Sequence, residues 1–303
     1  MKKSKIIFFA LLIAVGVNAQ QDPMYSQYWI NATILNPAQV AADGYTTLNL
    51  TGRYQWINVD GAPKTTSVSF SGMPVNKLGI GGSYIYDEIG PVRSHTLNAD
   101  FAYHLKISHT WTVTIGTRVS LMNTAVNLTD LYIDQQGDPG FVQNLNTGLK
   151  PNAGFGLLLH NEHFYIGYAE PRTVDYNLSS SEFMNVKIMT NRFLYSGYNF
   201  TLNEEVNLRP SVLLKQVNNT LTQFDFNLVA EFNSRLSTGL SYRTGDGIGA
   251  MIGIVPAEKF KIYYCYDYPL SPISQISKQT HQLSLIYTFS KKDKRIDSPR
   301  YFE

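Results

Sequence analysis

The chain has 303 residues, of which 16% are charged, and a formal net charge of +2 at pH 7. It has no basic stripe of the kind that phosphate backbones require, so we expect no nucleic-acid partner. The 20 Tyr, 16 Phe and 22 Gly are compatible with a barrel that hides a lipid face among polar lumen residues. The single cysteine, Cys265, can form no intramolecular disulfide and is expected to be structural.

Residues 1–19 have the form of a secretory signal peptide. Lys2, Lys3 and Lys5 precede an apolar run over residues 6–17, and cleavage is expected after Ala19. The run is well short of the roughly 20 residues that a membrane anchor needs. No cysteine follows it, which excludes a lipoprotein anchor, and no later run could form a transmembrane helix. Any membrane insertion must therefore be as a barrel.

Residues 20–44 form a leader whose apolar residues follow no clear helical or strand period. It is too apolar to remain in water, because it carries Met24, Tyr25, Tyr28, Trp29 and Ile30. We expect the leader to pack either inside a barrel lumen or against its periplasmic rim.

From residue 45 to residue 289 the chain is a succession of short alternating segments. The final segment is the clearest, with one face fit for lipid (Leu283, Leu285, Tyr287, Phe289) and one fit for water (Gln282, Ser284, Thr288). Ile286 breaks the alternation. About fourteen strands are predicted, at 46–57, 64–72, 77–87, 94–105, 110–122, 152–160, 163–169, 191–200, 206–216, 223–232, 235–243, 247–254, 260–268 and 281–289.

This pattern predicts an all-β fold, a transmembrane antiparallel β-barrel with a leader and a periplasmic tail. Tight connections near residues 74–76, 107–109, 161–162, 203–205, 233–234 and 256–258 are expected in the periplasm. The long segments 123–151, 170–190 and 269–280 are expected outside the cell. Gly137-Asp138-Pro139-Gly140 and Ser179-Ser180-Ser181 indicate loop and not strand. Pro210 predicts a bulge or an early strand end.

The tail over residues 290–303 begins with a basic run and ends with Pro299, Arg300, Tyr301 and Phe302. It is either a frayed terminus or a periplasmic docking peptide, because arginine and aromatic side chains are frequent anchors of interfaces.

Catalytic chemistry has no support in the sequence, and we expect neither an enzyme nor a cofactor. His160 and His163 lie across a tight turn, which favours a surface turn over a zinc site. No Gly-x-Ser-x-Gly elbow occurs. Gly79, Gly81 and Gly82 are expected in a barrel strand with a close-packed face and not in a nucleotide loop.

Charged residues are expected on the lumen face of several strands. They could line a channel or pair across a filled lumen, and pairing is favoured because confined charges pair. The candidates are Arg53, Asp100, His104, Arg118, Arg209, Lys215, Asp225, Glu231, Arg243, Lys261 and Asp267.

Several motifs of the mature chain together carry a family resemblance. They are Gln21-Asp22-Pro23-Met24-Tyr25-Ser26-Gln27-Tyr28, Asn36-Pro37-Ala38, Arg53-Tyr54-Gln55-Trp56, Asp87-Glu88-Ile89-Gly90-Pro91, Pro210 to Lys215, Tyr266-Asp267 with Ser277 to His281, and Pro299 to Phe302. In these the chain resembles the PorP/SprF family of type IX secretion system membrane proteins. The resemblance implies an outer-membrane component of a gliding or protein-secreting Gram-negative bacterium.

Such proteins associate with the periplasmic motor and translocon, or they partner a large secreted adhesin whose C-terminal domain they help to export or hold. The short chain favours the adhesin-partner role. In that hypothesis the outer loops contact the adhesin, while the leader and tail contact the secretion machinery. The alternatives are a passive or ligand-selective channel, suggested by the polar lumen, and a membrane-embedded enzyme, for which His104 or Asp100 would have to be essential.

Overall fold

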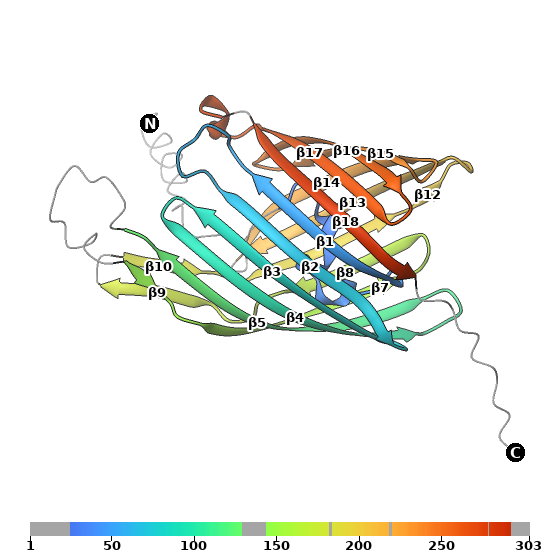
Figure 1. The fold of residues 1–303 in the computed structure, drawn as a ribbon, viewed down its shortest axis with the longest axis horizontal. Helices are drawn as coiled ribbons and strands as arrows, with labels where there is room; N and C mark the ends of the chain where they lie inside the picture. Colours follow the sequence, from blue (N-terminus) through green and yellow to red (C-terminus); the bar gives the residue numbers. More distant parts are fainter. Residues whose placement is uncertain (1–24, 129–143, 182–183, 218–219, 278, 292–303) are drawn as a thin grey trace, which may run out of the picture.

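The computed structural model describes residues 25–128, 144–181, 184–217, 220–277 and 279–291. Fourteen antiparallel strands form a closed barrel (Figure 1). They are β1 Tyr45–Tyr54, β2 Lys64–Val75, β3 Leu78–Ile89, β4 Val92–Lys106, β5 Thr112–Val126, β7 Lys150–His160, β8 Phe164–Glu170, β11 Asn191–Tyr198, β13 Val206–Val217, β14 Thr220–Phe232, β15 Leu236–Arg243, β16 Gly247–Ala257, β17 Phe260–Pro269 and β18 Thr280–Lys291.

Each strand of the ring pairs with the next along the chain, and β1 closes the ring by pairing with β18. Short strands extend this wall. Leu145–Asn146 (β6) pairs with the end of β5, and Phe200–Thr201 (β12) continues β11 alongside β13. A separate hairpin of Tyr176–Ser181 (β9) and Met184–Ile188 (β10) lies in the long connection between β8 and β11. The fourteen-strand prediction is therefore confirmed.

The two ends of the barrel differ in their connections. Tyr45 begins β1 and Lys291 ends β18 at the same end, which also carries the tight turns after β2, β4, β7, β14 and β16. In outer-membrane barrels this is the periplasmic end, called the inner end below. The long connections 127–149, 171–190 and 270–279 leave and rejoin the wall at the other, outer end, where the short turns after β3 and β15 also lie.

Two local predictions were wrong. Ser179–Ser181 lie in β9 and not in a loop, because the segment pairs with β10 as a hairpin of its own. Pro210 neither bulges nor ends its strand, and the register shift of β13 against β14 comes later, between Lys215 and Gln216. The interruption falls instead in the neighbouring strand, between β11 and β12, because proline has no N–H to donate across that ladder. Gly137–Gly140 lie outside the described residues.

Alternation along each strand produces a lipid face and a lumen face. Exposed apolar side chains cover the outside, among them Leu50, Phe101, Phe226, Leu240 and Leu283. The neighbours of such residues point inward and are mostly polar and buried, as Ser67, Thr114 and Ser284 are. Among the described residues the helices are short, and none is long and apolar enough to cross a membrane.

The leader lies inside the ring, as the dark blue segment of Figure 1 shows. It forms three short helical turns, Tyr28–Asn31 (η1), Ala32–Leu35 (α2) and Pro37–Gln39 (η2). Of the two packing modes expected for it, the lumen is the one that the structure shows. A further short turn, Pro272–Gln275 (η4), lies in the last outer connection.

Candidate functional site

The leader runs through the lumen from the outer end to the inner end. Contacts with strands of known direction fix this path. In chain order, Ser26 contacts Gln282 near the outer end of β18, Ile30 contacts Asn49 in the middle of β1, Asn36 contacts Leu157 in the inner half of β7, and Ala41 contacts Ser71 near the inner end of β2. The first described residue, Tyr25, therefore lies towards the outer mouth.

Asn36 anchors the inner half of the leader and is fully buried. Its side-chain nitrogen lies 3.1 Å and 3.2 Å from the carbonyl oxygens of Leu157 and Tyr168 and 2.8 Å from the Tyr195 hydroxyl. Its side-chain oxygen accepts from the backbone N–H of Ala38 at 2.8 Å and so caps η2. One amide group therefore ties the leader to three strands, β7, β8 and β11.

Glycines in the wall make room for this part of the leader. A Cβ placed on Gly156 of β7 would lie 1.8 Å from Oδ1 of Asn36, and one on Gly116 of β5 would lie 2.2 Å from the backbone nitrogen of Ala38. Gly79 and Gly81 of β3 face Val40 in the same way. The expected close-packed face of the glycine series is therefore present, and its packing partner is the leader.

Arg118 of β5 holds the middle of the leader. Its Nε and Nη2 atoms donate to the two carboxylate oxygens of Asp100 on β4, at 2.6 Å and 2.8 Å. Its Nη1 and Nη2 atoms also donate to the carbonyl oxygens of Ile34 and Thr33, at 2.7 Å and 2.6 Å. A buried ion pair with its remaining donors satisfied in this way binds wall and leader together.

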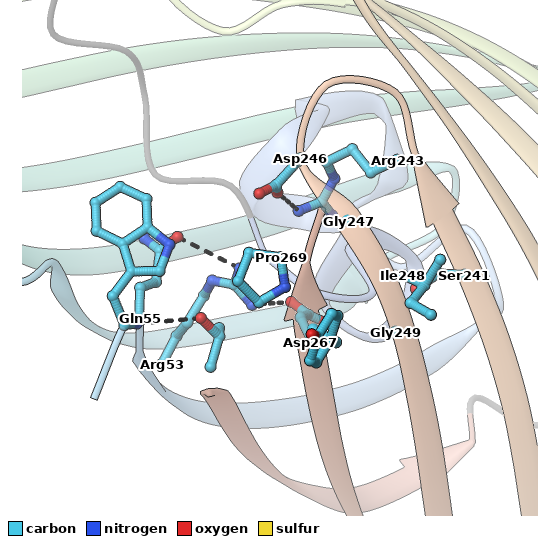
Figure 2. A pocket seen from close by; sticks show the side chains of 13 residues that line it. Arg53, Gln55, Ser241, Arg243, Asp246, Gly247, Ile248, Gly249, Asp267 and Pro269 are labelled. Atoms are coloured by element: carbon cyan, nitrogen blue, oxygen red, sulfur yellow. Dashed lines mark hydrogen bonds and ion pairs between the residues drawn. The ribbon is translucent and has the colours of Figure 1, made fainter. Parts of the chain in front are cut away.

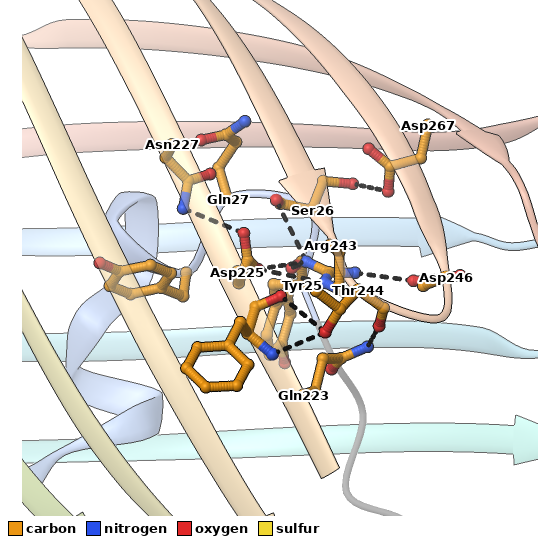
Figure 3. Close-up of polar contacts among 12 residues, drawn as sticks. Tyr25, Ser26, Gln27, Gln223, Asp225, Asn227, Arg243, Thr244, Asp246 and Asp267 are labelled. Atoms are coloured by element: carbon orange, nitrogen blue, oxygen red, sulfur yellow. Dashed lines mark hydrogen bonds and ion pairs between the residues drawn. The ribbon is translucent and has the colours of Figure 1, made fainter.

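A second ion pair holds the leader near the outer mouth (Figure 3). Arg243 donates to the Asp225 carboxylate at 2.8 Å, to Asp246 at 3.1 Å and to the carbonyl oxygen of Tyr25 at 2.7 Å. The carbonyl of the leader therefore completes the coordination of a buried guanidinium.

A third ion pair joins β1 and β17 at the same level. Arg53 and Asp267 lie 2.7 Å apart, and the Ser26 hydroxyl contacts both side chains. A pocket opens beside them, lined by Arg53, Gln55, Arg243, Asp246 and Asp267 among others (Figure 2). Its opposite charges, Arg53 with Asp267 and Arg243 with Asp246, are already paired with one another, so the pocket is polar without an unpaired charge in its lining.

Apolar wall residues pack against the leader between these ion pairs. One cluster joins Tyr28 and Ala38 with Leu158, Phe193, Tyr195 and Leu213. A second joins Ile30 with Val229, Met251, Tyr263 and Cys265, and Trp29 and Ile286 pack against it. Ile286 breaks the alternation of β18 because it faces this cluster. Apolar residues on a lumen face were thus the sequence signal for a filled lumen.

Most of the predicted lumen charges are paired, which is the arrangement that the sequence analysis favoured over an open charged channel. Arg53 with Asp267, Arg118 with Asp100, and Arg243 with Asp225 are buried pairs, whereas Arg209 with Glu231 is a more exposed pair near the inner end. His104 and Lys215 are buried, and Lys261 is exposed at the inner end of β17. The leader contacts made by Asn36 and Tyr195 were not predicted.

The remaining predicted sites concern metal ligation and the two ends of the chain. Within the described part of the chain, no group of three or more His, Cys, Asp or Glu residues could hold a metal ion. His160 ends β7 and His163 precedes β8, on the two sides of a tight turn. The signal peptide at 1–19 and the docking residues Pro299, Arg300, Tyr301 and Phe302 lie outside the described residues.

Known proteins resemble the chain in family and in fold. The family model of "Type IX secretion system membrane protein PorP/SprF" matches residues 17–287. The CymD monoaromatic hydrocarbon channel is 10% identical over 84% of this chain and 91% of its own, with a TM-score of 0.52. A TodX mutant monoaromatic hydrocarbon channel is 11% identical over 86% and 94%, with a TM-score of 0.51. At these identities the likeness shows the fold alone.

No curated protein matches the chain. The family match covers most of the chain, and the closed barrel has the architecture of outer-membrane proteins. The chain therefore belongs to the PorP/SprF family of type IX secretion system membrane proteins, and it is an outer-membrane β-barrel component of that system.

Proposed function

We propose that this barrel is a non-enzymatic, plugged scaffold that supports the export or surface attachment of a secreted adhesin and, through it, gliding. The observation that carries the proposal is the leader, which is bound along the lumen by Arg243 and Arg118 of the wall and, through its own Asn36, by Tyr195. A lumen filled in this way leaves the two ends of the barrel as the surfaces on which partners can act.

The outer connections are the proposed contact with the adhesin's C-terminal domain. Several of their apolar side chains are exposed: Leu149 is 71% exposed, Leu270 57% and Ile276 72%. Exposed apolar residues in outer loops have no lipid to cover them, and burying them against a protein is favourable. The hairpin of β9 and β10 gives the second long connection a regular backbone.

Affinity purification of a tagged chain from native membranes, followed by mass spectrometry, tests this function. We expect a large secreted adhesin in the eluate, and we expect the double variant Leu270→Ser/Ile276→Ser to recover less of it. Leu202→Ser is the matched control, because Leu202 is 62% exposed in an inner turn. Ring lipoproteins without an adhesin would instead indicate a core part of the motor or translocon.

A channel is the second candidate, favoured by the polar lumen face. The two similar structures described above are hydrocarbon channels by name. Planar-bilayer conductance distinguishes the two functions. A plugged scaffold should be silent when intact and should conduct once residues 25–40 are deleted, whereas a steady large conductance of the intact chain would establish the channel.

A further inference from the structure

A surface at the outer end of the barrel wall combines an apolar row of side chains with a polar one. Across β17, β18, β1, β2, β3 and β4 the strand register aligns outward-facing residues in rows. One row is apolar apart from a tyrosine: Ile262, Leu285, Leu50, Val68, Tyr84 and Leu97. The outermost row is polar and aromatic: Tyr266, His281, Tyr54, Lys64, Glu88 and Arg93.

The intervening row is a transition, with Thr66, Tyr86 and His95 on β2, β3 and β4. Successive rows on one face of a strand are about 7 Å apart. The wall therefore changes from apolar to polar within about 14 Å over six neighbouring strands, and on β2, β3 and β4 the outermost residues are charged. Such a change marks the level at which the hydrocarbon core gives way to lipid headgroups.

The charges at this level have an excess of one sign. The register places Lys64 and Arg93 on either side of Glu88, so two cations flank one anion. The Glu88 carboxylate already accepts a hydrogen bond from the Tyr86 hydroxyl at 2.9 Å. Outer-leaflet headgroups at this level thus meet three charged side chains with one excess positive charge.

Two outward-facing histidines add hydrogen-bonding groups to the same surface. Nδ1 of His95 lies 2.8 Å from the Tyr84 hydroxyl, and Nδ1 of His281 lies 2.5 Å from the Tyr264 hydroxyl. The same arrangement of tyrosine and histidine therefore occurs on β3 with β4 and on β17 with β18. We call Lys64, Arg93, His95 and His281 the outer basic belt.

We propose that the outer basic belt binds the phosphate of an anionic outer-leaflet lipid, a phosphorylated lipid A headgroup. The acyl chains would lie on the apolar row, while Lys64 and Arg93, which lie nearer the outer end, contact the phosphate. A protein partner fits less well, because the belt continues directly into the lipid face. A zwitterionic lipid offers no net charge to match the excess of cations.

Native mass spectrometry of the purified full-length barrel tests the proposal. Diphosphorylated lipid A is titrated against the wild type, the double variant Lys64→Gln/Arg93→Gln, and the control Lys77→Gln/Lys106→Gln. The control removes two cations from the inner ends of β2–β3 and β4. The belt variant is expected to bind about ten- to thirty-fold more weakly, at roughly 1 kcal/mol for each cation near a charged membrane surface, and the control is expected to bind as the wild type does.

Two results would overturn the proposal. One is equal weakening in the belt variant and the control. The other is wild-type affinity that does not change when the lipid A is dephosphorylated. Heat-modifiable electrophoretic mobility verifies that every variant is a folded barrel, so a misfolded variant cannot be counted as a loss of binding.

Discussion

At the scale of residues, the lumen depends on charges that are buried together with their partners. Arg53, Arg118 and Arg243 are 2%, 3% and 6% exposed, and each lies against an aspartate. A charge left alone in such a place is costly, whereas a paired and fully hydrogen-bonded one is tolerated. In two of the three pairs, backbone carbonyls of the leader complete the coordination of the arginine.

The Arg118 pair provides the first prediction. Arg118→Met should lower the free energy of unfolding by about 3–5 kcal/mol, because Asp100 would remain buried without its partner. Arg209→Met should cost less than about 1 kcal/mol, because Arg209 is 43% exposed in its pair with Glu231. Urea unfolding in lipid vesicles measures both, and equal losses would mean that burial does not set the strength of the Arg118 contact.

Gly156 provides a second residue-scale prediction. Gly156→Ala should weaken the packing of the leader against the wall, because the new Cβ would lie 1.8 Å from Oδ1 of Asn36. Gly52→Ala is the control, since its Cβ would meet its nearest atom at 3.9 Å. Intermittent conductance in planar bilayers is expected from the Gly156 variant alone. Silent recordings from both variants would show that the leader accommodates the methyl group.

At the scale of elements, the leader takes its structure from the wall. Its helical turns are four, four and three residues long, and segments so short are not stable in water by themselves. Side chains from β1, β5 and β15 donate to its backbone carbonyls, and backbone carbonyls of β7 and β8 accept from its Asn36 side chain. The barrel therefore acts as the core on which this segment folds.

The direction of the leader provides the prediction at this scale. A peptide tag inserted before Tyr25 should be labelled on intact cells, because Tyr25 and Ser26 contact Arg243 and Gln282 near the outer ends of their strands. A tag after Glu303 should be labelled only once the outer membrane is permeabilised. If the tag before Tyr25 also requires permeabilisation, the leader does not pass through the lumen in the membrane.

At the scale of the whole molecule, different parts of the chain lie at the two ends of the barrel. The even strand number brings Lys291 back to the end at which Tyr45 starts. The leader then reaches the opposite mouth through the lumen. Partners at the outer and inner ends would consequently bind different parts of the same chain.

The tail provides the prediction at this scale. Deleting Pro299 to Glu303 should leave the barrel inserted and heat-modifiable, because β18 ends at Lys291. If the tail is a docking peptide, copurification of periplasmic partners should fall while recovery of the adhesin is unchanged. Unchanged recovery of the periplasmic partners would exclude the docking role and leave the frayed terminus.

The sequence by itself determined the barrel. Alternation with a period of two is a local property, because successive side chains of a strand point to opposite faces. Segments such as Leu283 to Phe289 therefore specify both strand and orientation without reference to any other part of the chain. Turn residues mark where strands end, and the lengths of the connections together with the even number of strands predict which end is the inner one.

Tertiary structure alone decided what fills the lumen. The leader has no period, and its partners are distant in sequence, as when Asn36 meets Leu157, Tyr168 and Tyr195. Lumen-facing Ile286 and wall glycines such as Gly156 were visible in the sequence, yet their partner was not. Contacts of this kind exist only once the ring has closed, because closure brings many strands around one segment.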